Sequence, residues 1–73
     1  MNRQEDLEKV SLLTHGQECT IYWHEEGGLL VIRNYDEFFL FEIPQYGGHP
    51  RYERHYGLNQ IHELIEVAYT KYT

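Results

Sequence analysis

The spacing of apolar residues divides the chain into a helical segment, a series of strands and a second helical segment. Asn2 followed by Glu5 is typical of a helix start, because an amide oxygen can accept a free N–H group and a carboxylate can bond back. Apolar residues then recur at helical spacing, at Leu7, Val10 and Leu13. The pattern predicts a helix over residues 3–14, with a stop at His15-Gly16.

From residue 18 the hydrophobic period changes to two, and β-branched and aromatic residues become frequent. Strands are predicted over residues 18–25, 29–34 and 37–43. Gly27-Gly28 and Tyr35-Asp36 lie between them and favour tight turns. This part of the chain is therefore expected to form an antiparallel meander.

The C-terminal third predicts a loop, an edge strand and a helix. Residues 44–50 contain two prolines and a Gly pair, which favour a loop, and the alternation over residues 51–56 is compatible with a fourth strand. A helix over residues 59–71, capped by Asn59, carries apolar residues at Ile61, Leu64, Ile65, Ala68 and Tyr69. The expected fold is one α+β domain over residues 1–73. Its order is α-β-β-β-(β)-α, a three- to four-stranded antiparallel meander with helices on at least one face.

The two hairpins determine which side chains share a face of this sheet. A first turn on Gly27-Gly28 places Trp23 opposite Ile32, and a second turn on Tyr35-Asp36 places Ile32 opposite Phe39. One face then becomes entirely apolar and is the predicted core: Cys19, Ile21, Trp23, Leu30, Ile32, Phe39, Phe41 and Ile43.

The opposite face is predicted to hold a second apolar stripe that could bind a partner. Its residues are Tyr22, Val31, Phe38 and Leu40, with Arg33 beside them. If both helices pack on the predicted core face, this stripe is left exposed, and an exposed apolar patch usually marks an interface. Alternatively, one helix covers each face, or the loop around Tyr46 folds across the stripe.

Composition and charge limit the compartment and the partners. The chain has 73 residues, 41% of them hydrophobic, which suffices for one small core. One cysteine excludes an internal disulfide, and the first ten residues do not resemble a targeting peptide, so a reducing cytoplasm is expected. A net charge of −6 opposes general nucleic-acid binding, and no apolar run is long enough to span a membrane.

No motif in the sequence predicts a catalytic residue, a cofactor or a metal. His62 and Glu66 share a helix face, but a second histidine at ligand spacing is missing, so a solvated helix face is the simpler interpretation. Cys19 lies near His15 and His24, yet it falls on an apolar face where burial raises a thiol pKa and suppresses reactivity. The chain is therefore not expected to be an enzyme.

The segment from His49 to Tyr56 is a second candidate site. It combines basic and aromatic side chains that suit an anion or a protein partner, namely His49, Arg51, Tyr52, Arg54 and Tyr56. The charge of the chain favours a structural interpretation of this segment, in which the arginines of an edge strand pair with the surplus carboxylates.

The function that these patterns favour is a small non-enzymatic protein-interaction module. It would be an adaptor, or an inhibitor that covers a site on a larger protein, and its size alone is typical of a protein encoded by a phage or mobile element. The partner is expected to be another protein or a second copy in a homodimer, without a membrane role. The alternative is a small nucleic-acid- or anion-binding domain using residues 51–56, which the charge disfavours.

Overall fold

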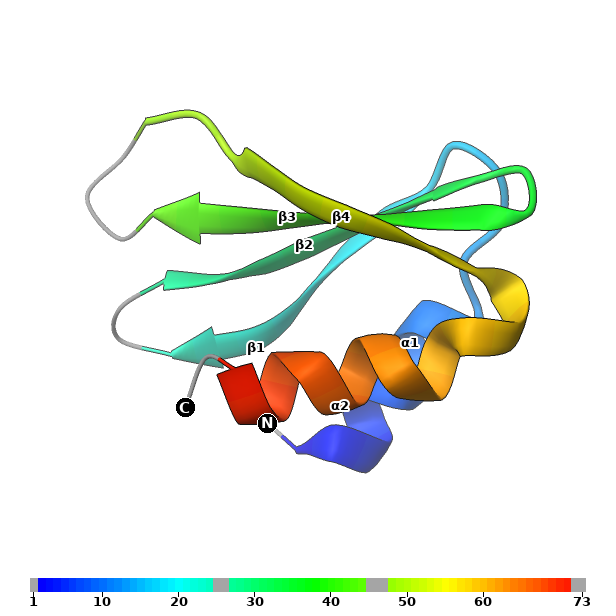
Figure 1. The fold of residues 1–73 in the computed structure, drawn as a ribbon, viewed down its shortest axis with the longest axis horizontal. Helices are drawn as coiled ribbons and strands as arrows, with labels where there is room; N and C mark the ends of the chain where they lie inside the picture. The colour runs from blue at the N-terminus through cyan, green and yellow to red at the C-terminus, as the bar shows by residue number, and fades with distance from the viewer. Residues whose placement is uncertain (1, 25–26, 45–47, 72–73) are drawn as a thin grey trace.

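The computed structural model describes residues 2–24, 27–44 and 48–71, and it shows a four-stranded antiparallel sheet with two helices (Figure 1). The elements follow in the order α1 (Arg3–Ser11), β1 (Glu18–His24), β2 (Gly27–Asn34), β3 (Glu37–Pro44), β4 (Arg51–Gly57), a 3₁₀ turn η1 (Leu58–Gln60) and α2 (Ile61–Lys71). Strand order in the sheet is β1-β2-β3-β4, a simple meander. The predicted α+β fold is confirmed, and the fourth strand is present.

Helix α1 begins where the sequence predicts and ends earlier. The N–H of Glu5 donates to the side-chain oxygen of Asn2 over 2.8 Å, which is the expected cap. The helix ends at Ser11, because the N–H of Thr14 donates to Gln17 Oε1 over 2.9 Å and not to a helix carbonyl. Gly16 then adopts φ +87° and directs the chain toward the sheet.

The second hairpin has the predicted register. Ile32 pairs with Phe39 and Leu30 with Phe41, across a turn at Tyr35 and Asp36. Because cross-strand partners share a face, Leu30, Ile32 and their partners lie on one face of the sheet, while Val31 lies on the other.

The predicted register of the first hairpin is wrong for two reasons. Gly27 and Gly28, the predicted turn, belong to β2, and β1 contains a β-bulge. Ile21 pairs with Leu29, where the sequence-based model put it opposite Asn34. His24 pairs with Gly27, so the register shifts by one between Ile21 and His24. One extra residue in β1 moves every preceding side chain to the other face, and Ile21 therefore joins the face of Leu29.

Tyr22 forms the bulge and adopts φ +49°, which is unusual for a residue other than glycine. Its N–H donates to Asp6 Oδ2 over 3.0 Å, and the hydroxyl of Tyr69 donates to the same oxygen. Asp6 is only 2% exposed, so these hydrogen bonds are what makes its burial tolerable. One carboxylate thus joins α1, the bulge of β1 and α2.

Both helices pack on one face of the sheet, and it is the face opposite to the predicted core (Figure 1). The buried residues come from all strands and both helical segments: Val10, Leu13, Ile21, Leu29, Val31, Phe38, Leu40, Tyr56, Leu64, Ile65 and Ala68. Among the predicted core residues, only Ile21 is part of this cluster, and Cys19 packs against it. Leu30, Ile32, Phe39, Phe41 and Ile43 lie on the other face, and the side chain of Trp23 is outside the described residues.

Candidate protein-binding face

The first predicted partner site is buried, so the prediction that it forms an exposed binding surface is wrong. Val31, Phe38 and Leu40 are exposed by only 0%, 2% and 1% and lie under the helices. Tyr22 packs edge-on against Tyr69 of α2, with ring centroids 4.8 Å apart. The possibility that the Tyr46 loop covers this stripe concerns residues outside the described ones.

Arg33, which completed that predicted site, has a structural role at the same face. Its Nη1 donates to the carbonyl of Leu13 over 2.8 Å, and its Nε donates to the carbonyl of Tyr35 over 2.7 Å. Its guanidinium lies 5.6 Å from the ring centroid of Phe38. Arg33 thus connects the residues that follow α1 to the turn of the second hairpin through hydrogen bonds.

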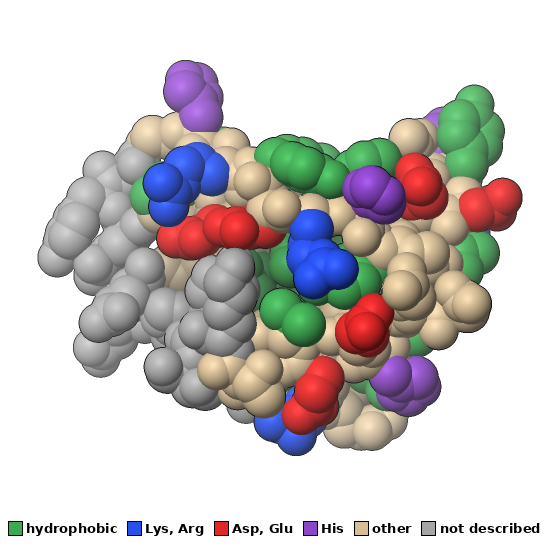
Figure 2. All heavy atoms as spheres, viewed as in Figure 1, with side chains coloured by type: hydrophobic (Ala, Val, Ile, Leu, Met, Phe, Trp, Pro, Cys, Tyr) green, Lys and Arg blue, Asp and Glu red, His purple; other side chains and the backbone are tan. Residues whose placement is uncertain are grey.

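The opposite face carries five apolar side chains that no helix of the described residues covers: Leu30, Ile32, Phe39, Phe41 and Ile43. We call this surface the open face. Each of the five is half-buried by its neighbours on the sheet, and none belongs to the core cluster. Figure 2 shows hydrophobic side chains along the upper border of the molecule, on the side of the sheet away from the helices. An apolar surface of this kind on a small domain is an interface candidate.

An aromatic cluster extends the open face onto β4. The ring of Tyr52 lies 5.6 Å from Phe41 and 6.2 Å from Phe39, and His55 lies 5.9 Å from Phe39. The hydroxyl of Tyr52 is 2.9 Å from Nδ1 of His55. Tyr52 is 52% exposed, which leaves half of its surface available for a partner.

A second bulge explains why Tyr52 and His55 share this face although they are three residues apart. Leu40 pairs with Arg54, but Phe41 pairs with Tyr52, so the register shifts at Glu53. Simple alternation would put Tyr52 and His55 on opposite faces. The alternation predicted for residues 51–56 is therefore interrupted.

The second predicted site is divided between the two faces. Arg51 pairs with Glu42 in the sheet and forms an ion pair with it over 3.5 Å, and Arg54 lies 4.8 Å from the ring of Tyr56. Tyr56 is buried in the core, whereas Tyr52 belongs to the open face. His49 is exposed ahead of β4. The structure does not gather these residues into one anion site.

Among the described side chains, none of Lys or Arg lies on the open face. Arg33, Arg51 and Arg54 lie on the helix-covered side by register, and Arg3, Lys9 and Lys71 belong to the two helices, which accounts for all 6 basic residues. Among the described residues that are paired in the sheet, the charged groups on the open face are the carboxylates Glu18 and Glu37, both toward the end of the sheet that holds the second hairpin turn.

The free edge of β1 is occupied by side chains of α1. Lys9 Nζ donates to the carbonyl of Thr20 over 3.1 Å, and Asp6 accepts the N–H of Tyr22. These contacts use outward backbone groups that another strand would need, so α1 protects this edge against pairing. A partner can therefore reach the open face more readily than the edge of β1.

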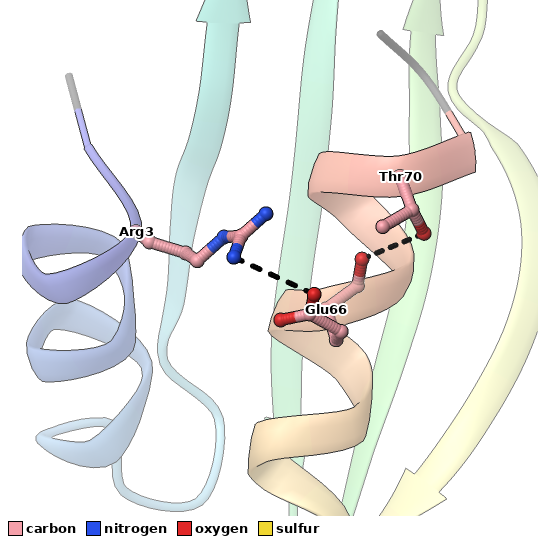
Figure 3. A network of polar contacts seen from close by, with 3 residues as sticks. All are labelled: Arg3, Glu66 and Thr70. Carbon is pink, nitrogen blue, oxygen red and sulfur yellow. Dashed lines mark hydrogen bonds and ion pairs between the residues drawn. The ribbon is translucent and has the colours of Figure 1, made fainter.

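A groove of about 220 Å³ lies between α1 and α2, and its polar rim contains a surface ion pair. Arg3 and Glu66 approach to 3.5 Å, and Thr70 Oγ1 donates to the Glu66 carbonyl over 2.9 Å (Figure 3). Side chains of both charged residues are more than half exposed, at 53% and 57%. Because water screens both charges, the ion pair between Arg3 and Glu66 contributes little to the stability of the fold.

The surroundings of Cys19 make its thiol harder to ionise. The thiol is half-buried against the core, and desolvation raises its pKa above the ordinary value, with Lys9 opposing and Asp6 adding to the rise. Among the described residues, no group of three or more His, Cys, Asp or Glu side chains is placed to hold a metal ion. The search for a helix long and apolar enough to cross a membrane also found none in this part of the chain.

Compared with protein families, with characterised proteins and with solved structures, the chain shows no significant match. The geometry of the open face therefore carries the functional argument. Sequence reasoning missed this face because it assigned the same residues to the core. The conflict between two apolar faces and only two short helices did predict that one apolar face stays uncovered, but the helices pack on the face that was expected to be open.

Proposed function

We propose that this chain is a small non-enzymatic protein-interaction module that binds an apolar surface of another protein molecule through its open face. The observation that carries the proposal is the group of five aliphatic and aromatic side chains on the face of the sheet that lies away from α1 and α2. Folding alone does not require apolar residues on the open face, because the solvated face of an antiparallel sheet normally carries polar side chains.

The residue types suit protein recognition. Phe and Tyr are enriched at interfaces because a rigid ring buries a large area with little loss of side-chain entropy. Phe39, Phe41 and Tyr52 form a contiguous aromatic group beside Leu30 and Ile32. A partner covering this group would remove apolar surface from water, at about 25 cal/mol per Å².

A nucleic-acid partner is less well supported by the same surface. Aromatic rings on an open sheet can stack on bases, but such sites also need cations that neutralise the phosphates. The charged groups that the strand pairing places on the open face are Glu18 and Glu37, both acidic, and the chain has a net charge of −6. Phosphates would therefore be repelled where the bases would have to stack.

The partner is a different protein, for which the chain acts as an adaptor or inhibitor, or a second copy in a homodimer. Both are forms of one proposal, since both need the open face. An inhibitor that imitates nucleic acid would present carboxylates, whereas the open face is apolar at its centre.

Site-specific photocrosslinking in the cells that encode the chain tests this proposal. A photoreactive phenylalanine analogue replaces Ile32 on the open face or, as control, Leu12, which is apolar and 79% exposed at the end of α1. We expect one discrete protein adduct from position 32 that disappears when Phe41→Asp is added, and no such adduct from position 12. Equal adducts at both positions would contradict the proposal, and an adduct removed by nuclease would favour the nucleic-acid alternative.

A further inference from the structure

We propose that the occupant of the open face is a second copy of this chain, packed face to face about a twofold axis, and that protonation of His55 opens this dimer. The inference rests on the proposed function and names its partner and its regulation. Charge distribution, the protected edge of β1 and the position of His55 support it.

The open face can meet its own copy without opposing charges at the centre. Leu30, Ile32 and the facing phenylalanines on β3 are uncharged, and the two carboxylates, Glu18 and Glu37, lie toward one end of the strands. A twofold axis in the interface and perpendicular to the strands sends this end toward the opposite end of the copy. Two twisted sheets would then pack in an aligned sandwich about 10 Å apart, with the helices outside.

The size of the face predicts a weak and reversible dimer. Four strands about 4.8 Å apart and about eight residues of about 3.4 Å each give a flat footprint of roughly 500 Å² per copy. Standard stable interfaces bury about 800 Å² per partner, so this contact belongs to the small, transient class. Pairing through the edge of β1 would require displacing Lys9 and Asp6 from their backbone partners.

His55 lies inside this footprint and would be desolvated by the second copy. Its ring contacts Phe39, and its Nδ1 lies 2.9 Å from the hydroxyl of Tyr52. A neutral ring can accept the Tyr52 O–H at Nδ1, whereas a protonated ring cannot and brings a charge into an apolar contact. Because the dimer is weak, one charge per copy is enough to shift its equilibrium.

The ionisable groups around His55 are few, since no helix of the described residues packs on this face. On its own strand they are Tyr52 and Glu53, and on β3 the carboxylate of Glu37 lies two residues along from Phe39, the cross-strand partner of His55. Glu37 is exposed, so solvent screens it from the ring. A proton taken up by the ring of His55 would therefore place a charge inside this apolar contact.

Sedimentation velocity over a concentration series up to about 1 mM tests the inference, at about pH 7.5 and about pH 5.5, which bracket the titration of histidine. We expect a monomer–dimer equilibrium at the higher pH and a dissociation constant at least about tenfold larger at the lower pH. His55→Phe should keep the dimer at both values. His62→Phe, which changes an exposed histidine of α2, should leave the pH response intact. Ile32→Asp should be monomeric at both, with an unchanged circular dichroism spectrum.

Each alternative outcome contradicts a defined part of the inference. A monomer throughout, together with a position-32 crosslink to a different protein, would overturn the second copy and leave the proposed function standing. Equal dissociation constants at the two pH values, or a pH response retained in His55→Phe, would overturn the role of His55. A dimer that survives Ile32→Asp would show that another surface is used.

Discussion

The two faces of this sheet are almost equally apolar in sequence, yet one is the core and the other is open. Leu29, Leu30, Val31 and Ile32 follow one another in β2 and alternate between the faces. Leu29 and Val31 are covered by both helices, whereas Leu30 and Ile32 have no helix of the described residues above them. The difference teaches that hydrophobicity alone does not identify the core of a sheet. The position of the covering helices decides it.

Substitutions at two neighbouring residues of β2 should give the largest difference in stability between the two faces. Val31→Glu should leave the chain largely unfolded, because a carboxylate at a position with 0% exposure has no partner, at a cost of several kcal/mol in a marginally stable domain. Ile32→Glu, one position along, should fold because its side chain faces solvent in the monomer. Thermal unfolding followed by circular dichroism compares the two. A folded Val31→Glu protein together with an unfolded Ile32→Glu protein would reverse the assignment of the faces.

A pair of phenylalanines in β3 sharpens the same comparison by cavity formation. Phe38→Ala should lower the free energy of unfolding by about 3–5 kcal/mol, since Phe38 is buried and its removal leaves a cavity. Phe41→Ala should cost about 1 kcal/mol, because it removes only half-buried surface and the contact with Tyr52. Urea titrations of both variants measure the difference. Equal losses would mean that both faces are packed alike.

Asp6 maintains the bulge that places Ile21 on the core face, so changing Asp6 should destabilise the fold by an intermediate amount. Asp6→Asn removes the charge that strengthens the hydrogen bonds from Tyr22 and Tyr69, for a predicted loss of about 1–3 kcal/mol. Glu8→Gln, on the exposed side of α1, is the matched control and should change stability by less than about 0.5 kcal/mol. Chemical unfolding measures both, and equal effects would deny Asp6 its role.

Thiol reactivity gives the smallest predicted contrast between the faces. Desolvation raises the pKa of Cys19, so its alkylation should accelerate only at a pH above that of the unfolded chain. Any stability that the neutral thiol provides is present below its unfolded pKa and is lost as the pH rises through the folded pKa. A cysteine placed at neighbouring Thr20, with Cys19→Ser, should react faster because position 20 lies on the open face. Slower alkylation at position 20 would contradict this order.

The sequence predicts the elements of this fold because their signals are local. The cap at Asn2, the period of α2 and the turn at Tyr35 and Asp36 are each encoded within a few residues. The second hairpin therefore has the predicted register.

The bulge in β1 could not be predicted because its cause is distant in sequence. Tyr22 occupies a left-handed conformation without the usual glycine, and its N–H is held by Asp6, sixteen residues earlier. Asp6 is in turn held by Tyr69, which lies at the other end of the chain. A one-residue bulge reverses the faces of β1 upstream of it, so this nonlocal contact moves Cys19 and Ile21 to the other face. The exchange of predicted core and predicted binding surface on β2 and β3 has a different cause, because both helices pack on the face of Leu29 and Val31.

Solvent accessibility of individual methyl groups tests the central claim most directly, because it compares the faces without a mutation. A soluble paramagnetic agent is added to the methyl-labelled chain at a concentration where sedimentation shows a monomer, and signal loss is recorded by NMR. We predict strong attenuation for Leu30, Ile32 and Ile43 and weak attenuation for Leu29, Val31 and Leu40. The reverse order, or equal protection of both sets in the monomer, would contradict the open face.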